Sequence, residues 1–142
     1  MVLDQLNYIG IIVASVVSFI VGFLWYSPFL FGNVWMKLNG VTKKDTEKAK
    51  KKGMTKMMLL AFIGTLVTAS VLNILIIMSG VSEISTAISL SFIIWLGFIV
   101  ATTLLGSVLW DNKPWGLFLL NGAYWLVNVE IISIVLILCK DL

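Results

Sequence analysis

The sequence predicts an all-α protein, an integral membrane bundle of four transmembrane helices with a short interfacial segment after the first helix. Two observations predict this class. Of the 142 residues, 60% are hydrophobic and 12% are charged, and the mean hydropathy is +1.05, whereas charged residues approach about a quarter of a soluble domain. Charge is absent from 5–36, 57–82 and 84–110, and Glu130 alone interrupts 116–138. Each window exceeds the roughly 20 apolar residues that cross about 30 Å of hydrocarbon.

These windows divide the chain, residues 1–142, as a single transmembrane domain. The helices are expected at about 8–25, 57–78, 86–109 and 116–138. Pro28 ends the first helix, because proline lacks an amide hydrogen and disfavours helical geometry in the residue before it. We expect this helix to be retained and not cleaved as a signal peptide, since no basic residue precedes it.

The connection after the first helix is expected to remain outside the hydrocarbon. Its segment 29–38 is apolar and aromatic but too short to cross, so we place it at the interface or in a shallow re-entrant turn. Thr42 and Asp45 resemble a capping box, which predicts a short helix over 43–52 within a lysine-rich cytoplasmic loop at about 37–56.

Lysines predict the orientation. Nine fall on one side of the membrane, eight of them between Lys37 and Lys56, and only Lys140 falls on the other. The positive-inside rule therefore predicts a multi-pass protein of the cell membrane with both termini outside the cytoplasm. Aromatic residues expected at an interfacial belt lie at the same lysine-rich end: Trp25, Tyr26, Trp35, Trp110 and Trp115.

Composition argues against several functional classes. The clustered lysines fit a membrane-facing loop better than a nucleic-acid surface, so we expect membrane lipid and no nucleic acid as partner. Histidine is absent and Cys139 is the single cysteine, which leaves too few ligands for the usual zinc or haem sites. No phosphate loop or nucleophile elbow occurs. We therefore expect no metal, no cofactor and no enzymatic activity.

Two helices carry small residues at every fourth position, which places them on one face and allows close approach of another backbone. In the first helix these are Gly10, Ala14, Ser18 and Gly22, and in the second they are Ala61, Thr65 and Ala69, followed by Asn73. Such faces pack the helices of one chain or join subunits. Both alternatives stay open, and we expect a homo-oligomer.

The fourth helix presents a polar face made of Asn121, Tyr124 and Asn128. Unpaired polar groups in hydrocarbon cost several kcal/mol, so this face must look into the bundle or into a wet cavity. Partners are expected on the second or third helix, at Thr65, Thr68, Asn73, Thr102 or Thr103. The face serves either interhelical hydrogen bonding or a path for a substrate or ion.

Glu130 is the only ionisable residue inside an expected span, and it points away from Asn128 on a helical wheel. Lys140 lies about 15 Å along the helix, so an intramembrane salt bridge is not expected. We expect a protonated, hydrogen-bonded carboxyl with a role in proton coupling or a subunit contact; the alternative is a tolerated carboxyl that faces a polar gap or snorkels outward.

Three stretches resemble a known family. Residues 22–28 read Gly-Phe-Leu-Trp-Tyr-Ser-Pro and are followed by Gly32 and Trp35; similar blocks occur at 95–102 and 119–124. Together they resemble the small membrane proteins known as domain of unknown function 1761. The resemblance implies a bacterial or archaeal four-helix protein and brings no known substrate, cofactor or catalytic residue. Glu130 lies outside the family pattern.

The first of these stretches also has a physical interpretation of its own. Trp25 and Tyr26 anchor the chain at the headgroup level, and Ser27-Pro28 with Gly32 turns it back toward the membrane. The turn is either a rigid corner, which we favour, or the entrance to a site.

Three functions follow as hypotheses. The first is a small oligomeric permease or channel that uses the polar face of the fourth helix or Glu130. The second is a structural or accessory protein that packs with itself or with a partner. The third is a lipid-interacting protein whose lysine-rich loop, otherwise only a determinant of topology, attracts anionic headgroups.

Overall fold

The computed structural model describes residues 2–142, and this part of the chain is helical without any strand. The elements are η1 (Val2–Gln5), α1 (Tyr8–Trp25), α2 (Gly32–Asn39), α3 (Lys43–Lys51), α4 (Met54–Met78), α5 (Ile84–Ile94), η2 (Trp95–Val100), α6 (Ala101–Thr103), η3 (Leu104–Trp110) and α7 (Trp115–Leu138). Four helical stretches are long and apolar enough to cross a membrane: α1, α4, the continuous run from α5 to η3, and α7.

The observed ends differ from the expected ones by a few residues. The second span begins at Met54, three residues before the expected start, and so takes in Lys56. A lysine is tolerated at the end of a span because its stem lies along apolar surface while the ammonium reaches water. The fourth span begins at Trp115, directly after Pro114.

The third span is not the regular helix that was expected. Its segments η2 and η3 are π-helical, with only the three residues of α6 between them. A glycine lies in each, Gly97 and Gly106, and glycine weakens the regular helix. The third span is therefore the irregular one of the four. π-turns of this kind widen a helix locally and often mark functional positions.

Between the first two spans the chain makes two short helices. The apolar segment 29–38 does not cross: it contains a turn and then α2, whose eight residues end at Asn39, directly before Gly40. The capping box before α3 is confirmed, because the Thr42 hydroxyl accepts from the Asp45 amide at 3.3 Å while Asp45 accepts from the Thr42 amide at 2.9 Å. The helix that it starts ends at Lys51, one residue earlier than expected.

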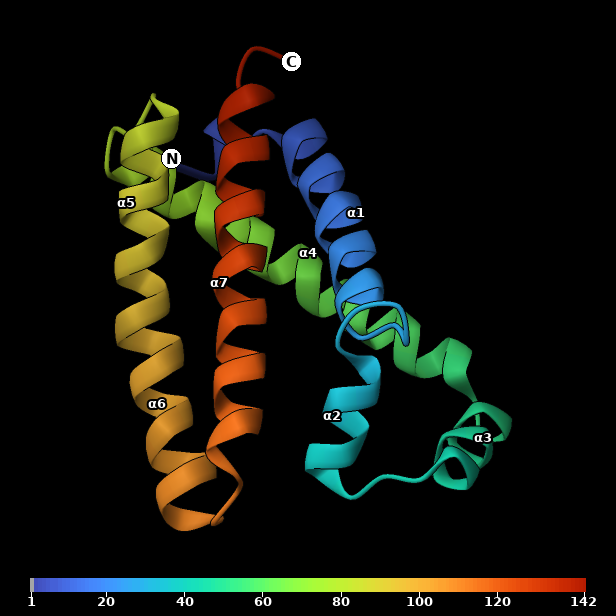
Figure 1. Cartoon of the computed structure of the whole chain (residues 1–142). Coiled ribbons are helices and arrows are strands. Elements are labelled where there is room, and N and C mark those ends of the chain that lie inside the picture. Colours follow the sequence, from blue (N-terminus) through green and yellow to red (C-terminus); the bar gives the residue numbers. More distant parts are fainter. Residues whose placement is uncertain (1) are drawn as a thin grey trace.

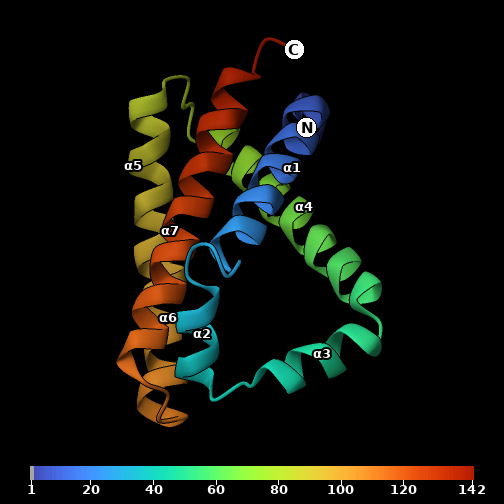
Figure 2. The same ribbon diagram turned by 45° about the vertical axis from the view of Figure 1, so that its right-hand side comes forward.

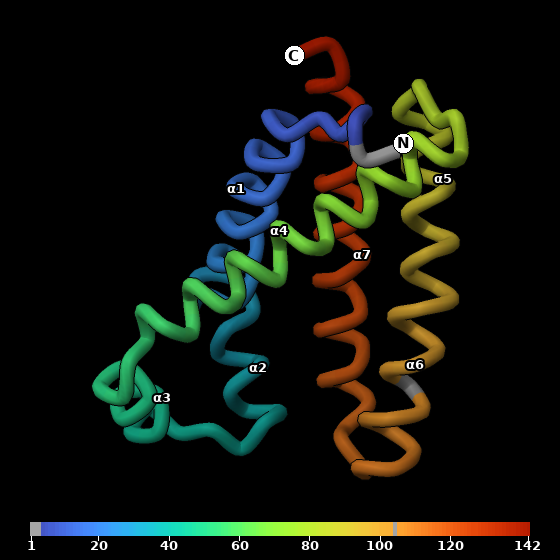
Figure 3. The backbone as a smooth tube through the Cα atoms, turned by 180° about the vertical axis from the view of Figure 1, so that it is seen from behind, coloured from blue at the N-terminus to red at the C-terminus, as the bar shows by residue number. Residues whose placement is uncertain are grey.

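The centre of the arrangement is α7, which packs against α1 on one side and against α5 on the other (Figure 1). Behind them α4 crosses at a slant, as Figure 3 shows from the reverse side. Its last turns lie near α7, and its first turns move away from α7 toward α3 (Figure 2). η1 and the last turn of α7 lie at the end of the molecule opposite α3.

The apolar core lies in the half of the molecule near the termini. Its fully or nearly buried side chains come from the start of α1, the end of α4, the start of α5 and the end of α7: Ile11, Ala14, Ala69, Leu72, Ile76, Ala87, Val129, Ile132, Leu136 and Ile137. Toward the lysine-rich end α4 leaves this core. The slant of α4 therefore leaves room between α1, α4 and α7 in the other half.

Candidate functional site

The site begins at a tight corner that follows α1. The Gly32 amide donates to the Ser27 carbonyl oxygen at 2.9 Å, and the Phe31 amide donates to that of Trp25 at 3.0 Å. A Cβ atom on Gly32 would lie 2.4 Å from the Tyr26 carbonyl oxygen. Because that neighbour is backbone and cannot move aside cheaply, only glycine fits, and the corner holds Tyr26 in place.

Hydrogen bonds join this end of α1 to α7. The Tyr26 hydroxyl donates to Asn121 Oδ1 at 2.9 Å. Two turns deeper, the Ser18 hydroxyl donates to Asn128 Oδ1 at 3.0 Å, and Asn128 Nδ2 donates to the Tyr124 hydroxyl at 3.1 Å. The polar face of α7 therefore looks into the chain, toward α1.

The prediction that threonines of the second or third span would bond to the polar face of α7 was wrong. The Thr65 and Thr68 hydroxyls donate to carbonyl oxygens of their own helix, each at 3.0 Å, and Thr102 likewise donates to Phe98. Threonine in a helix readily makes such bonds to the preceding turn, which satisfies it without a neighbouring helix. Thr103 is likewise not a partner of the face.

Asn73, grouped with this face in the sequence interpretation, lies at the other end of the molecule. Its side-chain oxygen accepts from the Asn7 amide at 3.1 Å, and the Asn7 side chain in turn donates to the Cys139 carbonyl oxygen. Asn73 therefore ties the start of α1 to α4 and contributes nothing to the α1–α7 contact.

The small-residue face of α1 packs inside the chain. Gly10, Ala14 and Ser18 are buried, and a Cβ atom on Gly22 would lie 2.7 Å from the Tyr124 hydroxyl. The corresponding face of α4 divides: Ala69 is buried, while Thr65 is half-buried and Ala61 is exposed. Only the part of α4 near the termini uses its small residues for close packing.

Aromatic rings gather where α1 ends against α7. The Tyr26 and Tyr124 rings meet edge to face with their centroids 5.0 Å apart, and the centroids of the Trp125 and Tyr124 rings lie 5.2 Å apart. The ring centroids of Trp25 and Phe31 are 4.6 Å apart, and those of Trp35 and Tyr26 are 6.0 Å apart. Edge-to-face and tilted contacts of this kind contribute about 0.5–1.5 kcal/mol each beyond burial, so the cluster stabilises the corner.

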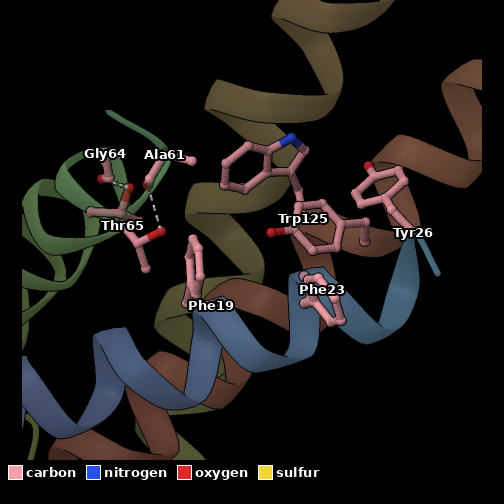
Figure 4. A pocket seen from close by; sticks show the side chains of 10 residues that line it. Phe19, Phe23, Tyr26, Ala61, Gly64, Thr65 and Trp125 are labelled. Carbon is pink, nitrogen blue, oxygen red and sulfur yellow. Dashed lines mark hydrogen bonds between the residues drawn. The ribbon is translucent and has the colours of Figure 1, made fainter. Parts of the chain in front are cut away.

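Beside this cluster lies a cavity of about 550 Å³ (Figure 4). It is lined by α1, the corner, the first half of α4 and α7, through Phe19, Gly22, Phe23, Tyr26, Ala61, Gly64, Thr65, Thr68, Tyr124 and Trp125. Its volume is in the range of small-molecule sites, about 300–1,000 Å³. Apolar and aromatic side chains dominate the lining, and its polar side-chain groups are tyrosine and threonine hydroxyls and the Trp125 indole.

The two phenols differ in what they offer the cavity. Tyr26 already donates to Asn121, and burial, with a smaller effect of Tyr124, raises its pKa well above the usual value. The Tyr124 hydroxyl accepts from Asn128, and its own hydrogen has no acceptor within residues 2–142. Tyr124 therefore holds a donor ready for a polar group in the cavity.

Glu130 lies on the other side of α7, as the helical wheel predicted, beside Ser91 of α5. Among the residues that the structure describes, its Oε2 atom is buried without a hydrogen-bond partner, as is Trp25 Nε1. Within residues 2–142 no group of three metal-binding side chains comes together. In the same part of the chain the two faces of α7 thus differ: on one, Asn121, Tyr124 and Asn128 each take part in a hydrogen bond, and on the other, one oxygen of Glu130 has no partner.

Several features of the site were not anticipated from the sequence. Tyr26 was interpreted as an interfacial anchor, and its bond to Asn121 was not expected. The Trp95 indole donates to the Gly122 carbonyl oxygen at 2.8 Å, which holds η2 against α7. Phe19 and Trp125 were not singled out, and Phe23 was noted only as part of the stretch 22–28. Gly64 was an available signal, because together with Ala61 and Thr65 it gives this half of α4 small side chains where the cavity lies.

A family model described as a protein of unknown function (DUF1761) matches residues 9–137. Comparison with curated proteins and with solved structures gives no match. The stretches 22–32, 95–102 and 119–124 lie within the matched range, and the structure brings them together through the contacts of Gly22 with Tyr124, of Tyr26 with Asn121, and of Trp95 with Gly122. The family match covers most of the chain, which therefore belongs to the DUF1761 family.

Proposed function

We propose that this protein binds an amphiphilic molecule, a membrane lipid or a compound of similar chemistry, in the cavity between α1, α4 and α7. The observation that carries the proposal is the cavity itself, with its phenylalanine, glycine and alanine lining and its tyrosine hydroxyls. An apolar chain fits the lining, and a polar group fits beside Tyr124, whose hydroxyl has a hydrogen to donate.

The surroundings of the cavity support a lipid. The four apolar spans have hydrocarbon as their natural solvent, and a cavity bordered by helices in hydrocarbon fills with apolar chains more readily than with water. The cavity lies at the end of α1 that leads into the corner and to α3, where lysines concentrate. A headgroup beside Tyr26 would therefore lie near the lysine-rich end.

The lysines favour an anionic headgroup. Between Lys43 and Lys56 the chain carries seven lysines against Asp45 and Glu47, and each lysine near an anionic surface contributes about 1 kcal/mol of attraction. With this end in the cytoplasm and both termini outside, the lysines would meet the anionic lipids of the inner leaflet. A reporter fused after Leu142 that is active only outside the cytoplasm tests this orientation.

Transport through the polar face of α7 has less support. Asn121 and Asn128 are both bonded to α1, so a path along this face would require those bonds to open. A structural or oligomeric role has a separate observation in its favour. In the third span only 6% of the most apolar window is buried, against 39% in α7, which leaves a large surface for a second copy of the chain or for lipid.

A cavity-filling substitution tests the proposal. Gly64 lines the cavity, and a Cβ atom there meets nothing within 4 Å, so Gly64→Phe fills the space without a backbone clash. The matched control is Gly97→Phe, because Gly97 is also unobstructed and lies outside the cavity. Native mass spectrometry after exchange into palmitoyl-oleoyl phosphatidylglycerol or phosphatidylcholine reports the lipids that each variant retains.

We expect the unmodified protein and Gly97→Phe to retain one phosphatidylglycerol, and Gly64→Phe to retain about tenfold less, which corresponds to about 1.4 kcal/mol. Phosphatidylcholine should be held more weakly in all three. Equal retention by Gly64→Phe and Gly97→Phe would contradict lipid binding in this cavity. Equal retention of the two lipids would leave the cavity in place and remove the role of the lysines.

A further inference from the structure

The contact between α7 and α5 contains a small polar cluster inside the span. Ser91 and Ser133 are both buried, and their hydroxyl oxygens lie 2.9 Å apart. The Ser91 hydroxyl also lies 2.5 Å from the Ala87 carbonyl oxygen and interacts with the Glu130 carboxyl. Three oxygen-bearing side chains therefore meet beside a backbone carbonyl, and Glu130 Oε2 remains without a partner.

The cluster lies deep in the hydrocarbon. Glu130 is eight residues from Leu138, where α7 ends, which corresponds to about 12 Å at about 1.5 Å per residue. It is farther from the other end, at Trp115. Ionised side chains at such depth are costly unless paired, and those that persist usually serve a function.

Among residues 2–142 no cation is placed to pair with Glu130. Glu130 lies beside Ser91 of α5, and neither α5 nor the following η2 contains a titratable side chain. On α7 itself the only other titratable side chain is Tyr124. Of the other helices that contact α7, α1 carries only Tyr8, while α4 carries Lys56 and α2 carries Lys37, both toward the lysine-rich end. The nearest lysine along the chain, Lys140, donates to the Ser82 carbonyl oxygen at 3.2 Å. Glu130 is half-buried with its Oε2 atom fully covered, so a carboxylate here would be an uncompensated charge.

We propose that Glu130, Ser91 and Ser133 form a proton-binding site within the membrane, separate from the cavity. In the loaded state the neutral carboxyl donates to the Ser91 oxygen, Ser91 donates to the Ala87 carbonyl oxygen, and Ser133 donates to Ser91, so that each hydroxyl hydrogen has an acceptor. On release the proton passes to water, the carboxylate remains, and the Ser91 hydroxyl turns from Ala87 to donate to it.

This exchange changes the contact of α5 with α7. Ser91 lies one turn before Trp95, where the π-helical segment η2 begins. A π-turn is a local irregularity that often marks a functional position, and an altered bond at Ser91 lies directly before the one that begins at Trp95. The site therefore couples a proton to the packing of that span.

Infrared difference spectroscopy in phosphatidylcholine nanodiscs tests the proposal. At pH 7 we expect a carbonyl band of a protonated carboxyl that disappears in Glu130→Gln and shifts to higher frequency in Ser91→Ala, which removes the hydrogen-bond acceptor. Ser133→Ala should shift it less and provides a second variant if Ser91→Ala does not fold. Gly64→Phe should leave the band unchanged, so that this result is independent of lipid binding in the cavity.

A second readout is labelling by dicyclohexylcarbodiimide, an apolar reagent that reacts with protonated carboxyls. We expect labelling at Glu130 that falls as the pH rises and is absent in Glu130→Gln. A carboxylate band from Glu130 at pH 7 would overturn the proposal, as would a carbonyl band indifferent to both serine substitutions. Protection from labelling by sodium ions, at constant pH, would show a cation site in place of a proton site and would also overturn it.

Discussion

The two faces of α7 carry similar numbers of polar groups and treat them differently. Toward α1, Asn121 and Asn128 are paired with Tyr26 and Ser18 across the helix contact. Toward α5, Ser133 is paired with Ser91, while one oxygen of Glu130 has no partner. The same helix therefore makes one contact in which both asparagines are hydrogen-bonded to the neighbouring helix and another in which a carboxyl oxygen has no hydrogen-bond partner.

The difference teaches which polar residues hold this protein together. A hydrogen bond between helices in a membrane contributes about 0.6 kcal/mol on average and up to about 1.7, so the α1 face stabilises the contact it occupies. An unpartnered buried polar atom costs about 1–3 kcal/mol. A residue that carries this cost, such as Glu130, is better explained by function than by stability.

The largest effect on stability is expected from a substitution at the corner after α1, which holds Tyr26 against α7. Gly32→Ala places a Cβ atom against the Tyr26 carbonyl oxygen and should cost about 3 kcal/mol, because the corner must open and Tyr26 leaves Asn121. Unfolding in mixed micelles with increasing dodecyl sulfate measures the free energy. The matched control is Gly64→Ala, where the Cβ atom meets nothing within 4 Å, and which should be neutral or stabilising by up to about 1 kcal/mol.

The next effect removes a pair on the same face. Asn128→Ala leaves the Ser18 hydroxyl without its acceptor and should cost about 2 kcal/mol. A double-mutant cycle with Ser18→Ala isolates the pair, and we expect a coupling of about 1 kcal/mol. Strictly additive losses would mean that Ser18 and Asn128 do not stabilise each other, and the distinction between the two faces would then fail.

The sequence predicts where the helices lie more readily than it predicts which helices contact one another. Spans follow from charge-free windows because the cost of charge in hydrocarbon is large and local, and α3 followed from Thr42 and Asp45 because a capping box depends only on adjacent residues. The partner of Asn128 did not follow. A helical wheel gives the face of a residue and not the helix opposite, and Ser18 was interpreted as one small residue among four.

The cavity could not be predicted for a related reason. It depends on the slant of α4, whose last turns pack in the core with α1 and α7 while its first turns leave that core, and no single residue encodes it. Glu130 was the opposite case. An isolated carboxyl in a charge-free window stands out in the sequence itself, although its neighbours Ser91 and Ser133 did not.

Replacing a polar side chain on the α5 face of α7 should raise the free energy of unfolding, whereas the same change on the α1 face should lower it. Glu130→Leu replaces an unpartnered carboxyl by an apolar side chain in an apolar contact and should stabilise the protein by about 1 kcal/mol. The same micelle titration measures it beside Asn128→Leu, which should destabilise. Loss of stability in Glu130→Leu comparable to that in Asn128→Leu would show that both faces are structural, and the proposed proton site would lose its energetic argument.

The smallest effect compares Glu130 with a carboxyl in water that has the same kind of partner. Hydrogen bonds from the Thr42 hydroxyl and from the Thr42 amide lower the pKa of Asp45 below its ordinary value of 3.8. Since the pKa in the folded state lies below that in the unfolded state, the stabilisation of α3 is complete above about pH 4 and is lost as the pH falls through the folded value.

Nuclear magnetic resonance titration of the Thr42 amide should therefore show a midpoint below pH 3.8, and Thr42→Val, which removes the hydroxyl donor, should raise it. A midpoint at or above 3.8 would contradict the bonded arrangement. In both places a hydroxyl contacts a carboxyl. For Asp45, water on all sides lets the hydroxyl favour the carboxylate. For Glu130, the proposed site in hydrocarbon removes that option, so we expect the solvent, and not the hydroxyl partner, to decide which protonation state the contact holds.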